Sequence, residues 1–211
     1  ALLTHPAVAA EADPSAVAFY LTLGYVPAPR SIWRGIRKLP PAHWLEIGES
    51  VGRPRPYWAL PGQAAEIEAD EAVSRVRESL GRSVARRMVA DVPVGVLLSG
   101  GVDSAVVAAL MCDAAGDPSR VKTFTAGFAD AEYDERAEAA ELAARLGTDH
   151  RELTVEPGDA ADLLDDLVHQ FDEPFADSSA IPTYYVSRYA RQHVAVALTG
   201  DAGDECFAGY D

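Results

Sequence analysis

The stretch that decides the fold is Val94-Gly-Val-Leu-Leu-Ser-Gly-Gly-Val-Asp-Ser104. The apolar run at its start ends in a polar turn with two glycines, and a helical pattern begins directly afterwards. This order predicts a strand that leads into a helix N-terminus, where unpaired backbone N–H groups and the helix dipole stabilise an anion. Gly100 and Gly101 let an anion approach the backbone without meeting a Cβ atom. The turn is therefore predicted to bind a phosphate group.

Asp103 places a carboxylate beside this anion site, which makes sense if a divalent cation lies between it and the phosphate oxygens. Ser99 and Ser104 add hydroxyl donors. The common phosphate loop requires a Gly-Lys pair, and the sequence contains none. The form S-G-G-x-D-S instead resembles the pyrophosphate loop (PP-loop) of ATP pyrophosphatases, enzymes that split ATP between its α- and β-phosphates. The competing interpretation is a serine-capped glycine turn that binds no ligand.

The overall composition limits which partners and functions are expected. The 211 residues carry a net charge of -15, with 48% hydrophobic and 24% charged residues. These values are ordinary for a soluble globular protein, and the acidic balance argues against nucleic acid as a partner. No apolar stretch approaches the ~20 residues that a bilayer-spanning helix needs, so no membrane partner is expected. Cys112 and Cys206 form no C-x-x-C pair and favour a reducing, cytoplasmic setting.

Residues 1 to about 60 differ from the rest of the chain. Prolines crowd this segment, and short runs such as 20–23 and 44–47 lie between them. The pattern indicates short strands and loops rather than helix. We therefore expect a small β-rich segment here.

From residue 63 onward the pattern becomes helical and then alternates between strands and helices. Acidic residues at 66–71 are expected to open a helix, and apolar residues at three- and four-residue spacing continue it from 73 to 88. The predicted strands are 94–98, 121–128, 151–155 and 194–198, and the predicted helices are 102–115, 134–146, 159–170 and 181–191. Continuous apolar strands separated by helices predict an α/β fold, a parallel sheet with helices on both faces. Ligands of such sheets bind beyond the carboxyl ends of the strands.

A second acidic turn, Thr199-Gly-Asp-Ala-Gly-Asp-Glu205, follows the last predicted strand. Its three carboxylates repel one another in a bare turn, and a divalent cation removes that repulsion. We expect Asp103 and Asp204 to hold Mg2+ together with ATP phosphates. The alternatives are a solvated turn or a calcium loop, although the spacing of the EF-hand calcium loop is absent. Three strand ends, at the first turn, at 126–128 and at this second turn, are expected to converge on one pocket.

With both turns in view, the chain resembles the glutamine-dependent asparagine synthetases. The matching stretches are the first turn with its strand from Pro93, Thr123-Phe-Thr-Ala-Gly-Phe128, Leu146-Gly-Thr-Asp-His150, Asp172-Glu-Pro-Phe-Ala-Asp-Ser-Ser179 and Leu198-Thr-Gly-Asp-Ala-Gly-Asp-Glu205, with Gly209-Tyr210. Residues 25–41 resemble the end of the family's glutaminase domain. The resemblance implies that residues 1–62 are the last part of an N-terminal-nucleophile glutaminase domain. Residues 63–211 then begin a synthetase domain of the PP-loop, adenine nucleotide alpha hydrolase-like fold.

The resemblance also implies the site residues. ATP is expected to contact Leu97, Ser99, Gly100, Gly101, Asp103, Ser104, Ala126, Thr199 and Gly200, with adenine against the backbone of Leu97 and Ala126. Mg2+ is expected at Asp103 and Asp204. Asp201 is expected to be the catalytic residue that positions the activated intermediate or the incoming ammonia, and Asp177 to shape the pocket for the substrate carboxylate.

The implied reaction is that of a ligase in amino-acid biosynthesis. The aspartate side chain attacks ATP to give β-aspartyl-AMP and pyrophosphate, and ammonia from glutamine then forms asparagine and AMP. The family's N-terminal cysteine nucleophile is not in this sequence, and the last motif ends at Asp211, so we expect a fragment. The alternatives are a relative that activates another carboxylate, such as a β-lactam synthetase or a peptide cyclase, and a non-catalytic ATP-binding fragment. The expected partners are small molecules and, among macromolecules, a second copy of the chain as a homodimer.

Overall fold

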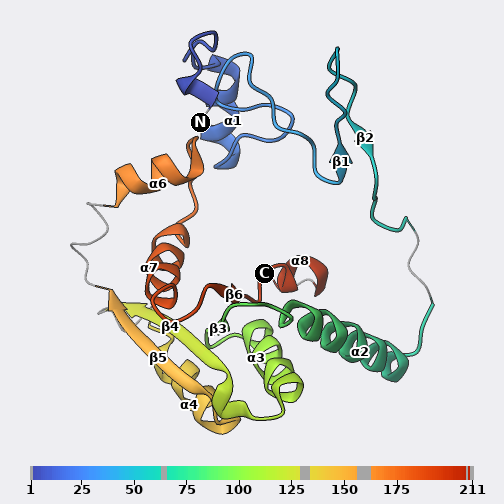
Figure 1. Cartoon of the computed structure of the whole chain (residues 1–211), viewed down its shortest axis with the longest axis vertical. Coiled ribbons are helices and arrows are strands. Elements are labelled where there is room, and N and C mark those ends of the chain that lie inside the picture. Colours follow the sequence, from blue (N-terminus) through green and yellow to red (C-terminus); the bar gives the residue numbers. More distant parts are fainter. Residues whose placement is uncertain (1, 63–65, 129–133, 156–162, 208, 210–211) are drawn as a thin grey trace. The chain divides into compact units, whose positions relative to one another are not determined.

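The computed structural model describes residues 2–62, 66–128, 134–155, 163–207 and 209. These residues form two compact units (Figure 1). One consists of Ala1–Glu66 with Leu163–Ser178, and the other of Ile67–Asp162 with Ser179–Asp211. The second unit contains both acidic turns.

A parallel sheet of four strands forms the centre of the second unit. Its strands are β3 (Val94–Leu97), β4 (Lys122–Phe128), β5 (Asp149–Val155) and β6 (Val196–Leu198), in the spatial order β5-β4-β3-β6. Strand β3 pairs with β4 on one side and with β6 on the other, both in parallel. The parallel sheet predicted from the sequence is therefore confirmed, and the carboxyl ends of β4, β3 and β6 are neighbours.

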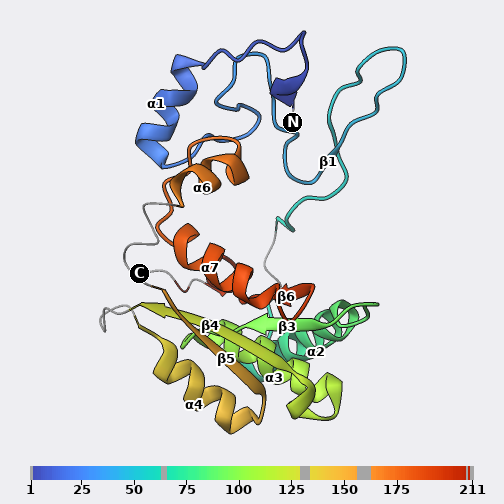
Figure 2. The same cartoon turned by 60° about the vertical axis from the view of Figure 1, so that its left-hand side comes forward.

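Helices cover both faces of this sheet, as Figure 2 shows. The helices that pack in its cores are α2 (Ala69–Arg87), α3 (Val102–Ala115), α4 (Arg136–Leu146) and α7 (Ala180–Ala190). The unit also contains a 3-10 turn η2 at Pro118–Arg120 and a short helix α8 (Gly203–Phe207) after β6. Val96 and Leu98 pack in a core with α3 and α4, whereas Phe124 packs with Val186 and Ala190 on the side of α7. Successive strand residues point to opposite faces, so each strand needs apolar residues throughout.

The alternation of strands and helices predicts most element positions correctly. Helix α3 has the predicted bounds, and it ends at Gly116, which adopts the left-handed conformation with φ 70°. Strand β6 begins two residues later than predicted and is partly exposed, because it lies at an edge of the described sheet. The predicted helix over 159–170 is observed as α6 (Leu164–Phe171), and its residues 159–162 lie outside the described part.

The first unit corrects one prediction. The sequence pattern predicts a strand or loop at 20–23, but this run lies in the helix α1 (Pro14–Leu23). The side chain of Asp13 accepts a hydrogen bond from the backbone N–H of Ser15, Pro14 occupies the first helical turn, and Gly24 ends the helix with φ 78°. These are ordinary helix start and stop signals. Because prolines are frequent throughout this segment, its overall composition favours loops and outweighs these helix signals.

The described residues 24–62 of this unit are short strands and loops, as expected, whereas its segment Leu163–Ser178 contains the helix α6. Strands β1 (His43–Trp44) and β2 (Arg55–Pro56) pair antiparallel, and a 3-10 turn η1 covers Leu2–Thr4. Its core is small and consists of Ala16, Val26 and Ile32, with Tyr20 and Trp33 packed against it.

Two further observations concern the chain as a whole. None of the helices in the described ranges combines the length and apolar character that crossing a bilayer requires. Cys112 lies in the core on α3, and burial raises the pKa of its thiol. Cys206 is exposed, and both thiols are free.

Candidate active site

The turn between β3 and α3 is held by its two serines. Their hydroxyls lie 2.8 Å apart, and the Ser104 hydroxyl accepts a hydrogen bond from the Ser99 backbone N–H at 3.1 Å. The Ser99 hydroxyl also accepts from the Gly101 backbone N–H at 3.2 Å. Ser104 is 5% exposed, whereas Gly100 and Gly101 are exposed. The buried serine therefore shapes the turn, while its glycine backbone faces solvent.

The helix that follows has no side-chain cap. Gly101 is the N-cap residue of α3 and has no side chain to accept a hydrogen bond. The first N–H groups of a helix have no partner within the helix, so they need an acceptor from elsewhere. A phosphate group is such an acceptor.

A carboxylate already contacts this turn. The Gly100 backbone N–H donates to Glu135 Oε2 at 3.1 Å, and a Cβ atom at Gly100 would lie 3.1 Å from Glu138 Cβ. Both glutamates belong to the first turn of α4 or its N-cap. The turn therefore donates a backbone hydrogen bond to an anion, and α4 packs closely against it.

The second acidic turn meets the first one. A Cβ atom at Gly200 would lie 2.6 Å from the Ser104 backbone nitrogen and 2.9 Å from Asp103 Cβ. A Cβ atom at Gly203 would overlap the Asp103 carboxylate itself. The predicted convergence of these two strand ends is confirmed, and glycine is required at both positions by the close approach.

The carboxylates of the second turn are individually placed. Asp201 Oδ2 accepts a hydrogen bond from the Thr199 hydroxyl at 2.8 Å. Asp204 is half-buried in the first turn of α8, and its carboxylate lies against the position that a Cβ atom of Gly209 would take. Within the ranges that the structure describes, no three His, Cys, Asp or Glu side chains are grouped to hold a metal ion.

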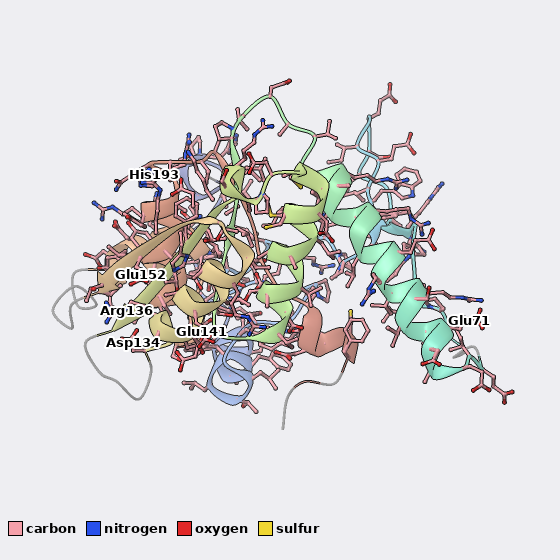
Figure 3. The ribbon with its side chains drawn as sticks, turned by 90° about the horizontal axis from the view of Figure 1, so that it is seen from below. Glu71, Asp134, Arg136, Glu141, Glu152 and His193 are labelled. Atoms are coloured by element: carbon pink, nitrogen blue, oxygen red, sulfur yellow. The ribbon has the colours of Figure 1, made fainter. Side chains whose placement is uncertain are left out.

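The third strand end carries an ion pair that the sequence analysis missed. The Arg136 side chain donates two hydrogen bonds to Asp134, from Nε at 2.7 Å and from Nη2 at 2.6 Å. Figure 3 labels both residues of the pair. A Cβ atom at Gly127 would overlap the side chains of Asp134 and Arg136. Hydrogen bonding to Arg136 lowers the pKa of Asp134, and that to Asp134 raises the pKa of Arg136. The sequence signal for this ion pair is the group of acidic residues directly before Arg136, between β4 and α4.

The predicted site residues divide between the two units. Leu97 and Ala126 pack in the same apolar cluster beside Phe124. Those that lie in the carboxyl-terminal halves of β3 and β4, or in the turns and first helical turns that follow β3 and β6, are Leu97, Ser99, Gly100, Gly101, Asp103, Ser104, Ala126, Thr199, Gly200, Asp201 and Asp204. Asp177 is exposed and belongs to the first unit, so its expected role remains a prediction.

The parallel sheet with helices on both faces and loops at its carboxyl edge places the chain in the class of α/β proteins whose ligands bind beyond the carboxyl ends of the strands. The particular family follows from the sequence. The model of the asparagine synthase family matches residues 75–211, more than half of the chain, and that of the glutamine amidotransferase domain matches residues 1–58. The chain belongs to the asparagine synthase family. The expected boundary between residues 62 and 63 remains a prediction.

Several relatives match nearly the whole chain. Asparagine synthetase (glutamine-hydrolyzing) 1 of Bacillus subtilis is 34% identical over 207 residues, which covers 95% of this chain and 32% of that protein. A Methanocaldococcus jannaschii protein assigned to the same activity is 36% identical over 197 residues, covering 92% and 38%. One from Mycobacterium tuberculosis is 37% identical over 205 residues, covering 95% and 31%. The chain thus spans about a third of the length of these relatives.

Proposed function

We propose that this chain forms part of a glutamine-dependent asparagine synthetase. The single observation that carries the proposal is the contact between Asp103 in the first turn and Gly200 and Gly203 in the second. Two acidic turns from distant parts of the sequence approach each other so closely that glycine is needed between them. Such a pair can surround the triphosphate of ATP. The family of the chain supports aspartate as the carboxylate substrate.

In the proposed reaction, an oxygen of the aspartate side chain attacks the α-phosphorus of ATP, and the bond from that phosphorus to the pyrophosphate oxygen breaks. Ammonia derived from glutamine then attacks the acyl carbon of β-aspartyl-AMP, loses a proton, and AMP leaves. The backbone N–H groups of the turn between β3 and α3 and of the first turn of α3 are proposed to stabilise charge on the pyrophosphate as it leaves. The two serines maintain the turn in the shape that this requires.

The carboxylates that the two turns bring together fit magnesium. This ion is usually held by one or two carboxylates, with substrate phosphates and water completing its shell, so a cage of three protein ligands is not needed. We propose Asp103 and Asp204 as these carboxylates. When bound, the ion would neutralise charge on the leaving pyrophosphate. Asp201 is proposed to orient the intermediate or ammonia, since its hydrogen bond from Thr199 fixes the carboxylate.

The remaining expectations are part of the same proposal. ATP is expected to place its adenine against the backbone of Leu97 and Ala126, which neighbouring strands bring to one side of the sheet. The cytoplasm is proposed as the location, because the thiols of Cys112 and Cys206 are free and reducing compartments maintain that state. A homodimer stays a prediction, and sedimentation of the gene product tests it.

The test is aspartate-dependent release of pyrophosphate. The full-length gene product is incubated with ATP, Mg2+, aspartate and either ammonia or glutamine. We expect release that requires aspartate and is lost in Asp103→Asn. The matched control is Asp113→Asn, an exposed carboxylate further along α3, which should retain activity. Release with other carboxylates but not with aspartate would favour a β-lactam synthetase-like or peptide-cyclising enzyme. No release with any carboxylate would favour a non-catalytic ATP-binding protein.

A further inference from the structure

Residues 163–178 belong to one family match but to the other structural unit. They lie within the range that matches the asparagine synthase family, 75–211. In the structure they pack with Ala1–Glu66, most of which matches the glutamine amidotransferase domain. The amidotransferase unit of this chain is therefore completed by a segment from the synthetase sequence.

One side chain, Glu173, makes the main polar contacts of this segment. Its Oε2 accepts a hydrogen bond from the Ile32 backbone N–H at 3.2 Å, and its Oε1 pairs with the Lys38 ammonium. The same ammonium donates to the Val26 carbonyl at 2.6 Å. The Glu173 side chain is 17% exposed and that of Lys38 35%. A carboxylate this shielded from water is retained only when its oxygens have partners, and here both have them.

The main chain is held on both sides of Glu173. The Trp33 indole N–H donates to the Asp172 carbonyl at 3.3 Å, and the Ala176 backbone N–H donates to the Gly24 carbonyl at 2.9 Å. Gly24 has φ 78°, and its Cβ position lies 3.6 Å from Ala176 Cβ. The backbone from 172 to 176 is thus fixed to the end of α1 and to the loop that follows it.

We propose that Glu173 is a positioning residue that couples the amidotransferase unit to the synthetase reaction. The inference rests on the proposed function. The anchored backbone ends at Ala176, the next residue is the predicted substrate-pocket residue Asp177, and α7 begins at Ala180. Three intervening residues span at most about 11 Å, so a displacement at the anchor reaches this stretch directly. Loss of the anchor should impair the use of ammonia from glutamine more than the use of added ammonia, because added ammonia does not depend on the amidotransferase unit.

The variant Glu173→Gln tests the coupling in the full-length gene product. Aspartate-dependent pyrophosphate release is measured with glutamine and, separately, with added ammonia. We expect the ratio of the glutamine rate to the ammonia rate to fall about tenfold, as loss of one charge-assisted hydrogen bond produces. The KM for ATP should not change, because the phosphate turn belongs to the other unit. Hydrogen exchange at the Ile32 and Ala176 amides should become faster.

The control is Glu11→Gln, which removes an ion pair with Arg34 in the same unit. Both of those side chains are more than half exposed, so we expect no change in the ratio. Lys38→Met should lower the ratio in the same direction, and the double variant should resemble either single one rather than their product. If Glu173→Gln does not fold, Lys38→Met carries the comparison.

The outcomes separate the two proposals. A parent protein that releases no aspartate-dependent pyrophosphate with added ammonia refutes the proposed function and the coupling with it. An active parent whose ratio is the same in Glu173→Gln refutes the coupling alone. Equal loss of the ammonia and glutamine rates assigns Glu173 a purely structural role and also refutes it.

Discussion

Replacing Gly200 by alanine tests directly whether the two acidic turns touch. The added methyl group would lie 2.6 Å from the Ser104 backbone nitrogen and 2.9 Å from the carbonyl carbon and Cβ of Asp103. These atoms belong to the first turn of α3 and cannot move aside as a flexible side chain would. No left-handed φ is required at Gly200, so the cost arises from the overlap alone.

The expected magnitude follows from two opposing effects. Overpacking costs about 1–3 kcal/mol, whereas the lower entropy of an unfolded chain with alanine contributes roughly 0.4–1 kcal/mol of stability. The overlap therefore prevails, by about 1–2 kcal/mol, and the melting temperature should fall by about 2–8 °C for a chain of this size. Displacing the first turn by even a few tenths of an ångström would also disturb the hydrogen bonds that we propose it makes to phosphate. ATP affinity should drop about tenfold.

The assays are thermal unfolding and calorimetric titration with ATP and Mg2+. Gly48→Ala is the control, because no atom lies within 4 Å of its Cβ position and its φ is not left-handed. Its unfolding free energy should stay within about 0.5 kcal/mol of the parent value. A Gly200→Ala protein with the melting temperature and ATP affinity of the parent would show that the turns do not meet as described.

Three further predictions concern α4, α2 and β5. Glu135→Gln removes a competing anion from the Gly100 N–H, so pyrophosphate should bind about three- to tenfold more tightly in calorimetric titration, whereas Glu141→Gln, exposed on the same helix, should not change the affinity. Gly81→Ala, in the interior of α2 with only one side-chain atom near 4 Å, should raise the free energy of unfolding by about 0.5–1 kcal/mol in denaturant titration. Burial lowers the pKa of His150 in the folded chain below its ordinary 6.5. Below pH 6.5 the unfolded chain therefore binds more protons than the folded chain, and the free energy of unfolding should decrease as the pH falls toward the folded pKa. His150→Gln should make the free energy of unfolding less dependent on pH in this range.

Each of these has a contradicting result. Weaker pyrophosphate binding in Glu135→Gln would mean that the carboxylate supports the turn instead of competing with the ligand. A less stable Gly81→Ala protein would show that α2 packs more tightly than its surroundings indicate. A pH dependence of unfolding that is the same with and without His150 would remove this residue from the acid response.

Local signals predict the second unit well and the first unit less well. The bounds of α3 are predictable because an apolar strand, two glycines and a C-terminal glycine mark both its ends. Helix α1 is missed although Asp13, Pro14 and Gly24 mark it, because neighbouring prolines carry more weight in the regional pattern than the caps do. Capping residues at specific positions therefore predict this helix better than the composition of the surrounding segment does.

The site is predictable only where the topology of the sheet itself brings residues together. Ligands bind at the carboxyl ends of parallel strands, and this rule is enough to predict that the two turns lie near each other. The contacts of Glu135 with Gly100 and of Glu173 with Ile32 join residues 35 and 141 positions apart. Each of these contacts depends on the path of the chain between its two residues, and no periodic pattern in the sequence predicts that path.

The hydroxyl pair of Ser99 and Ser104 is made entirely by the chain itself. Such a turn is preorganised, so a nucleotide that binds to it does not have to order a flexible segment. Little of the binding free energy is then lost to immobilising the protein. Selection can then adjust the affinity for nucleotide through neighbouring residues such as Glu135, while the Ser99–Ser104 hydroxyl pair stays unchanged. Relatives that differ in substrate could share the same turn and vary only the residues around it.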